Sequence, residues 1–92
     1  MSIVIGQVFE TKIQSVSAND AIYNLTVSFE QDRKIVVKKS FGDIFFDGNR
    51  MIVTLTPAET SLFVEGTAMV NTRAVLAKAT VAGCETIRVV KP

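Results

Sequence analysis

The chain has 92 residues, of which 48% are hydrophobic, and its ten basic and nine acidic residues give a formal net charge of +1. This length fits a single domain over residues 1–92, and so large an apolar fraction excludes a disordered chain. A charge this close to neutral provides no long-range attraction for nucleic acid or anionic lipid and does not oppose self-association. We therefore expect no nucleic acid and no membrane as partners, whereas a homo-oligomer remains open.

The chain contains no histidine and one cysteine, Cys84. Without histidine it lacks the commonest general base, the Ser-His and Cys-His nucleophile pairs and the usual zinc ligand. We therefore expect a protein that is not an enzyme, with no catalytic residue, no metal and no cofactor. Cys84 has no histidine to activate it, so we interpret it as a small residue that is at least half-buried. The first residues lack the basic region of a signal peptide, and no run is long enough for a membrane helix.

The first half of the chain reads as strands. Residues 2–16 give one or two strands with weak patterning. Residues 23–30 alternate between apolar and polar side chains, which is typical of a strand with one buried face; the apolar positions are Tyr23, Leu25, Val27 and Phe29. After a turn, residues 34–39 form a second strand, in which we expect Ile35 and Val37 to share the buried face. Basic residues around this strand indicate protection of a sheet edge rather than a phosphate site: Arg33, Lys34, Lys38 and Lys39.

Residues 44–56, "IFFDGNRMIVTLT", predict a second hairpin, because Asp47-Gly48-Asn49 suits a tight turn. We interpret this segment as a turn rather than a calcium loop, which needs more oxygen ligands at set spacing. Adjacent strand residues point to opposite faces, so one of Phe45 and Phe46 faces the core and the other faces outward. We name Phe46 and Ile52 as candidates for an interaction surface; subunit contact and simple strand propensity explain them equally well.

Residues 54–66, "TLTPAETSLFVEG", do not read as a strand. Thr56 fits an N-cap, Pro57 fits the first helical position, and Glu59 follows three residues after the cap. This is the pattern of a capping box, so we expect one short helix near residues 57–63 that closes one end of the core. Phe63, beside this polar cap, is our third candidate for the interaction surface. As a surface residue it would tolerate Phe63→Ala in the folded monomer, whereas loss of folding would place it in the core.

Residues 66–81 and 84–91 predict the last strands. In the first of these runs one face holds Ala68, Val70, Thr72, Ala74 and Leu76, and the other holds Met69, Asn71, Arg73 and Val75. In the second run we expect Ile87 and Val89 to face inward and Arg88 to face outward. About seven short strands with turns every 8–12 residues favour an all-β antiparallel sandwich, and a small barrel is the alternative. Carbohydrate-binding sandwiches usually expose Trp or Tyr platforms. This chain has no Trp and one Tyr, which makes a sugar-binding module the weaker interpretation.

Several motifs occur in a characteristic order over residues 22–76, about three-fifths of the chain. They are Phe29 with Gln31, Lys38-Lys39, Asp47-Gly48-Asn49, "LTPAET" at 55–60 with Phe63, and Val70 with Arg73. In order and spacing they resemble small immunoglobulin-like β-sandwich proteins of tailed bacteriophages and prophages of Gram-positive bacteria. The N-terminal domain of the baseplate upper protein is the best-known member of that group.

The resemblance implies an immunoglobulin-like sandwich and a non-enzymatic phage structural protein. Such a protein would be a tail, baseplate or neck component that binds other phage structural proteins, assembles in the bacterial cytoplasm and is located in the virion. The alternative is a small cytoplasmic phage-encoded regulatory protein that acts on one host or phage partner. Self-assembly of the purified protein would favour the structural role over the regulatory one.

Overall fold

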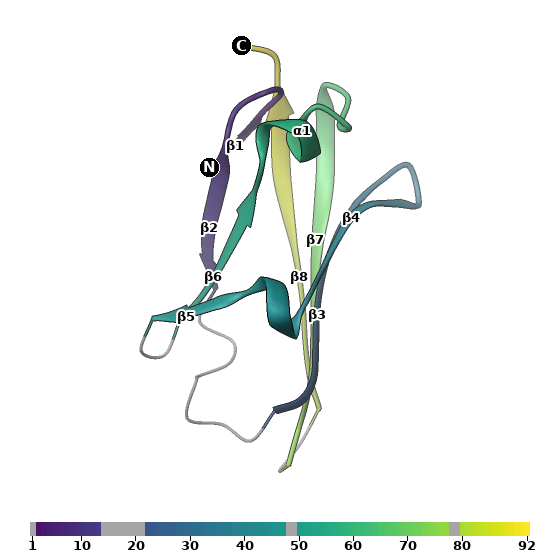
Figure 1. Cartoon of the computed structure of the whole chain (residues 1–92). Coiled ribbons are helices and arrows are strands. Elements are labelled where there is room, and N and C mark those ends of the chain that lie inside the picture. Colours follow the sequence, from purple (N-terminus) through teal and green to yellow (C-terminus); the bar gives the residue numbers. More distant parts are fainter. Residues whose placement is uncertain (1, 14–21, 48–49, 78–79) are drawn as a thin grey trace.

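The computed structural model describes residues 2–13, 22–47, 50–77 and 80–92, and these form two β-sheets packed face to face (Figure 1). The five-stranded sheet has the order β1-β8-β7-β3-β4 and the three-stranded sheet the order β2-β6-β5. The strands are β1 (Ser2–Val4), β2 (Phe9–Ile13), β3 (Ile22–Gln31), β4 (Lys34–Ser40), β5 (Phe45–Asp47), β6 (Arg50–Leu55), β7 (Gly66–Leu76) and β8 (Thr80–Val90). No ladder joins the two sheets within these ranges, so the fold is the expected all-β sandwich and not a small barrel.

The strand order is immunoglobulin-like. In the immunoglobulin pattern, strands B, E and D lie in one sheet and strands G, F, C and C′ in the other. The three-stranded sheet β2-β6-β5 reproduces the first set, and β8-β7-β3-β4 reproduces the second. The expectation of a wholly antiparallel fold was wrong at one place, because β1 runs parallel to β8, with Ser2 opposite Arg88 and Val4 opposite Val90.

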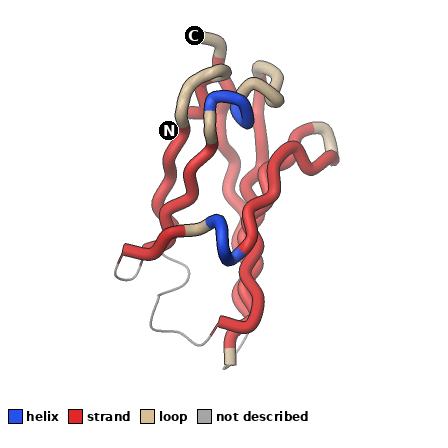
Figure 2. Tube along the Cα trace, viewed as in Figure 1, coloured by secondary structure: helices blue, strands red, loops and turns tan. Residues whose placement is uncertain are grey.

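Two short helical turns connect the sheets (Figure 2). The 3-10 helix η1 (Phe41–Asp43) leads from β4 in the large sheet to β5 in the small one. The helix α1 (Pro57–Thr60) leads from β6 back to β7. The expected helix near 57–63 is therefore present as a single turn, and it lies at one end of the sandwich beside the connection between β1 and β2 (Figure 1).

The core lies between the sheets and follows the alternation of the strands. It consists of Ile3, Phe9, Leu25, Val27, Phe29, Val37, Ile44, Met51, Val53, Leu55, Phe63, Ala68, Val70, Ala74, Ile87 and Val89. The fully buried ring of Phe29 packs edge to face against Phe9 on one side and Phe63 on the other, with ring centroids 6.3 Å apart in both pairs. Edge-to-face geometry is favoured between aromatic rings and adds to the burial of their apolar area.

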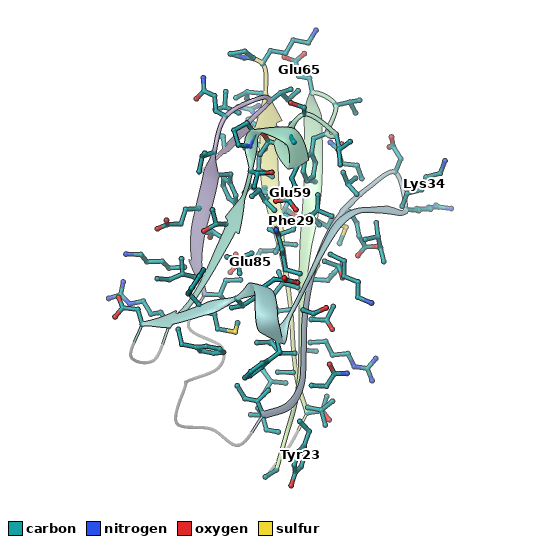
Figure 3. The ribbon with its side chains drawn as sticks, viewed as in Figure 1. Tyr23, Phe29, Lys34, Glu59, Glu65 and Glu85 are labelled. Carbon is teal, nitrogen blue, oxygen red and sulfur yellow. The ribbon has the colours of Figure 1, made fainter. Side chains whose placement is uncertain are left out.

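Two irregularities in the strand pairing, one in β3 and one between β3 and β4, expose side chains that alternation alone assigns to the core. The pairing of β3 with β7 shifts between Ile22 and Asn24, and Tyr23 is 77% exposed instead of buried. In Figure 3, Tyr23 lies at the end of the molecule farthest from α1. A second shift places Ile35 opposite Glu30, and Ile35 is exposed while Val36 packs against the core. A one-residue bulge moves side chains to the other face of a sheet, which explains both errors.

Candidate functional site

The capping box at α1 is fully formed. Thr56 has the extended backbone of an N-cap, and its Oγ1 accepts a hydrogen bond from the backbone N–H of Glu59 at 3.2 Å. In return, the backbone N–H of Thr56 donates to Glu59 Oε1 at 2.9 Å. Pro57 occupies the first helical position, where its missing N–H costs no hydrogen bond. The two hydrogen bonds of the capping box join residues three positions apart, so their first effect is to fix where the helix begins.

A second interaction connects this box to the other sheet. Lys39, on the edge strand β4, donates from Nζ to Glu59 Oε1 at 2.9 Å and to Oε2 at 2.8 Å. Glu59 therefore bonds the helix start and the large sheet at once. Partial burial by itself raises the pKa of Glu59, but the hydrogen bonds from Lys39 and from the Thr56 backbone outweigh burial, and the net pKa lies below its usual value. Sequence reasoning placed Lys39 among edge-protecting lysines and missed this partner.

Thr60 holds the connection between β1 and β2 against α1. Its side chain is fully buried, and its Oγ1 accepts from the backbone N–H of Gly6 at 3.1 Å. The hydroxyl has one proton to donate, and two carbonyl oxygens lie within reach of it, that of Gln7 at 2.8 Å and that of Pro57 at 3.1 Å. Gly6 has φ of +83°, a left-handed conformation that favours glycine. Thr60 was not singled out from the sequence, because its partners lie 53 and 54 residues away.

The segment after α1 is fixed in the same way. The Gln31 side-chain amide donates from Nε2 to the Val64 carbonyl oxygen at 2.8 Å, and its Oε1 accepts from the Val64 N–H at 2.9 Å. This pair joins the end of β3 to the connection that leads into β7. Thr60, Glu59 and Gln31 together make this end of the sandwich a hydrogen-bonded closure. Its residues are engaged in structure rather than directed at a ligand.

Phe63 was wrong as an interaction-surface candidate. It is 3% exposed and packs edge to face on Phe29. The turn of α1 directs the chain back over the open end of the sandwich, so the ring enters the core.

Phe46 was also wrong as an outward residue. It is half-buried and packs against the core, whereas Phe45, its neighbour, is 73% exposed. Ile52 lies opposite Phe45 on the outer face of the small sheet and is half-buried. Phe41 in η1 is 50% exposed, and its ring lies 5.9 Å from that of Phe46. We call Phe41, Phe45, Phe46 and Ile52 the aromatic edge. Phe45 and Phe46 belong to the edge strand β5, Ile52 lies opposite Phe45, and the ring of Phe41 lies beside that of Phe46.

No group of three or more Cys, Asp or Glu side chains that could hold a metal ion occurs among the described residues. Cys84 is exposed, contrary to expectation, because it lies on the outer face of β8.

A hollow of about 140 Å³ lies between the sheets beside Ile13, Val70 and Glu85. No described helix is long and apolar enough to cross a membrane. The predicted Asp47-Gly48-Asn49 turn lies partly outside the described residues.

A comparison with solved structures agrees with the fold. No family model and no curated protein sequence matches the chain. Among solved structures, the chain is similar to "a putative glycoside hydrolase from Bacteroides vulgatus ATCC 8482", with a TM-score of 0.60 and 19% identity. The match covers 99% of this chain and 16% of that one, so the chain spans about a sixth of the length of that protein. At this identity the likeness shows a shared fold alone.

Proposed function

We propose that this chain is a non-enzymatic structural protein of a tailed bacteriophage or prophage. It is a tail, baseplate or neck component that acts by docking onto other phage structural proteins. The ordered motifs over residues 22–76 support the phage assignment by resemblance. The virion is then its site of action, and the bacterial cytoplasm is where it assembles.

The aromatic edge is the observation that carries the docking role. Phe45 on the edge strand β5 and Phe41 in the preceding helix η1 expose large parts of their rings, although the domain has a hydrophobic core of its own. Contiguous exposed apolar area marks contact sites, and aromatic side chains are enriched in protein interfaces. The edge strand β5 has one free side within the described residues, so a partner can reach the exposed rings there.

A regulatory protein could bind a different partner through the same surface. The experiment must therefore measure how much of the protein is incorporated into phage particles. A Phe41→Ser, Phe45→Ser double variant is expected to fold like the wild type and to be incorporated into phage particles much less efficiently. Tyr23→Ser is the control, because Tyr23 is an aromatic residue as exposed as Phe45 but lies on β3 of the large sheet and outside the aromatic edge. Equal incorporation of all three proteins would contradict docking through the aromatic edge.

A further inference from the structure

Among the described residues, no strand pairs with one edge of the lower part of β8, which we call its free edge. The short strand β1 pairs only with Arg88, Val89 and Val90 of β8. From Thr80 to Ile87, β8 has β7 on one side and no described strand on the other. Figure 1 shows this part of the β7–β8 hairpin extending below β1. An unpaired strand edge presents a row of backbone donors and acceptors to any chain that can pair with it.

This edge lacks the protection that the other edges carry. Edge strands are usually blunted by shortness, charge, lysine or proline. The strands β1 and β5 have three residues each, β4 carries three lysines, and β2 carries Glu10 and Lys12. Residues 80–87, "TVAGCETI", contain one charge, Glu85, and no lysine or proline. Small side chains at Ala82, Gly83 and Cys84 leave the backbone open to close approach.

The ladder to β1 shows which residues point their backbone groups toward this edge. The N–H of Ile5 donates to the Val90 carbonyl oxygen at 3.0 Å, so Val90 faces the β1 side. Alternate residues of a strand direct both backbone groups to the same side. The residues that face the free edge are therefore Thr80, Ala82, Cys84 and Thr86. The odd-numbered residues face β7 instead.

We propose that a second copy of this chain pairs antiparallel with the free edge of β8, with a two-fold axis through the Gly83 pair. The second copy is thus one partner for the structural role proposed above. The pairing itself is argued from the β8 edge, and only its use in a phage particle rests on the proposed function. In this register Ala82 pairs with Cys84 of the second copy, and Thr80 pairs with Thr86. All four outward-facing residues of both copies are then paired. The large sheets of the two copies become continuous.

Symmetry and charge both favour this register. A two-fold axis perpendicular to a sheet places one residue opposite its own copy, so Gly83 and Cys84 are the central choices. An axis at Cys84 would set Thr80 opposite Arg88, whose edge is already paired with β1. With Gly83 at the axis, Glu85 faces Val81 of the second copy, so no like charges are opposed across the ladder. A Cβ added at Gly83 would meet nothing within 4 Å, so the strand is open there.

The test is the dependence of mass on concentration, measured by analytical ultracentrifugation on the whole chain. The wild type is expected to pass from monomer to dimer as its concentration rises. Ala82→Pro removes an N–H that points to the free edge and is not used in the β7 ladder, and proline is tolerated at such positions. Its dimer is expected to be at least about tenfold weaker. Ala82→Ser is the matched control, because it keeps the N–H and should dimerise like the wild type.

A crosslinking measurement tests the register. In the Ala82→Cys variant the new thiol lies opposite Cys84 of the second copy, at a Cα separation that a disulfide can span. Mild oxidation is therefore expected to yield covalent dimers from this variant and not from the wild type. A wild type that stays monomeric, an Ala82→Pro variant that dimerises as tightly, or a Cys84–Cys84 disulfide in the wild type would overturn the proposal. A dimer that is absent from phage particles would instead contradict the proposed function alone.

Discussion

The Lys39 ammonium group donates to both carboxylate oxygens of Glu59, at 2.9 and 2.8 Å, while the same carboxylate accepts the Thr56 N–H that begins α1. One side chain thus belongs to a local helix cap and to a contact between the edge strand β4 and the end of the small sheet. The two side chains are 14% and 28% exposed, so water screens the pair only in part. Glu59 lies beside α1 at this end of the sandwich (Figure 3), so the pair contributes to the closure there.

The Lys39–Glu59 pair should show a measurable coupling energy. Lys39→Met, Glu59→Gln and the double variant form a double-mutant cycle, in which we expect a coupling of about 1 kcal/mol in the free energy of unfolding, because the pair is partly shielded. Urea denaturation measures each free energy. Lys38→Met, on the neighbouring exposed position of β4, should couple to Glu59→Gln by close to zero. Equal coupling for both lysines would show that the contact adds nothing specific.

Stability should fall in acid through Glu59. Its pKa is lowered in the folded state, so the charged form is favoured by folding. That contribution is complete above the ordinary glutamate pKa of about 4.3 and is lost as the pH falls through the lowered pKa of the folded state. The stability difference between the wild type and Glu59→Gln should therefore be constant near neutrality and shrink in acid. A difference that stays constant down to about pH 3 would contradict this assignment.

The Thr60 hydroxyl should matter more than its methyl group. Thr60→Val keeps the shape but leaves the Gly6 N–H and the Gln7 carbonyl oxygen without their buried partner. We expect a loss of about 1–3 kcal/mol in the free energy of unfolding. Thr60→Ser keeps both hydrogen bonds and should be the milder change. The reverse order would mean that Thr60 acts by packing alone.

Truncation to alanine should change the free energy of unfolding much more at Phe63 than at Phe45. Phe63→Ala empties a core position against Phe29 and should cost about 3–5 kcal/mol. Phe45→Ala removes an exposed ring and should change the free energy of unfolding by no more than about 0.5 kcal/mol. Thermal or urea unfolding of the two variants measures both values. A large loss at Phe45 would place that ring in the fold rather than in a contact surface.

Local signals in the sequence were sufficient for the sandwich and for the helix start. Alternation in β3 identified Leu25 and Val27 as buried, alternation in β7 placed Val70 and Ala74 on one face, and the spacing of Thr56 and Glu59 identified the cap. Both depend on residues close together in the chain.

The errors come from effects that alternation and caps do not encode. A bulge exposes Tyr23, and the direction in which α1 returns the chain buries Phe63. The partners of Lys39 and Thr60 are 20 or more residues away, and only the fold brings them together. For the same reason the free edge of β8 could not be recognised before the short length of β1 was known.

Mass spectrometry of purified particles tests the proposed role as a structural part of a phage particle. Particles induced from the source strain would be separated from the lysate and searched for peptides of this protein. We expect recovery in fixed stoichiometry to the major tail protein. Absence from particles, with the protein abundant in the lysate, would contradict it and favour the small cytoplasmic regulator.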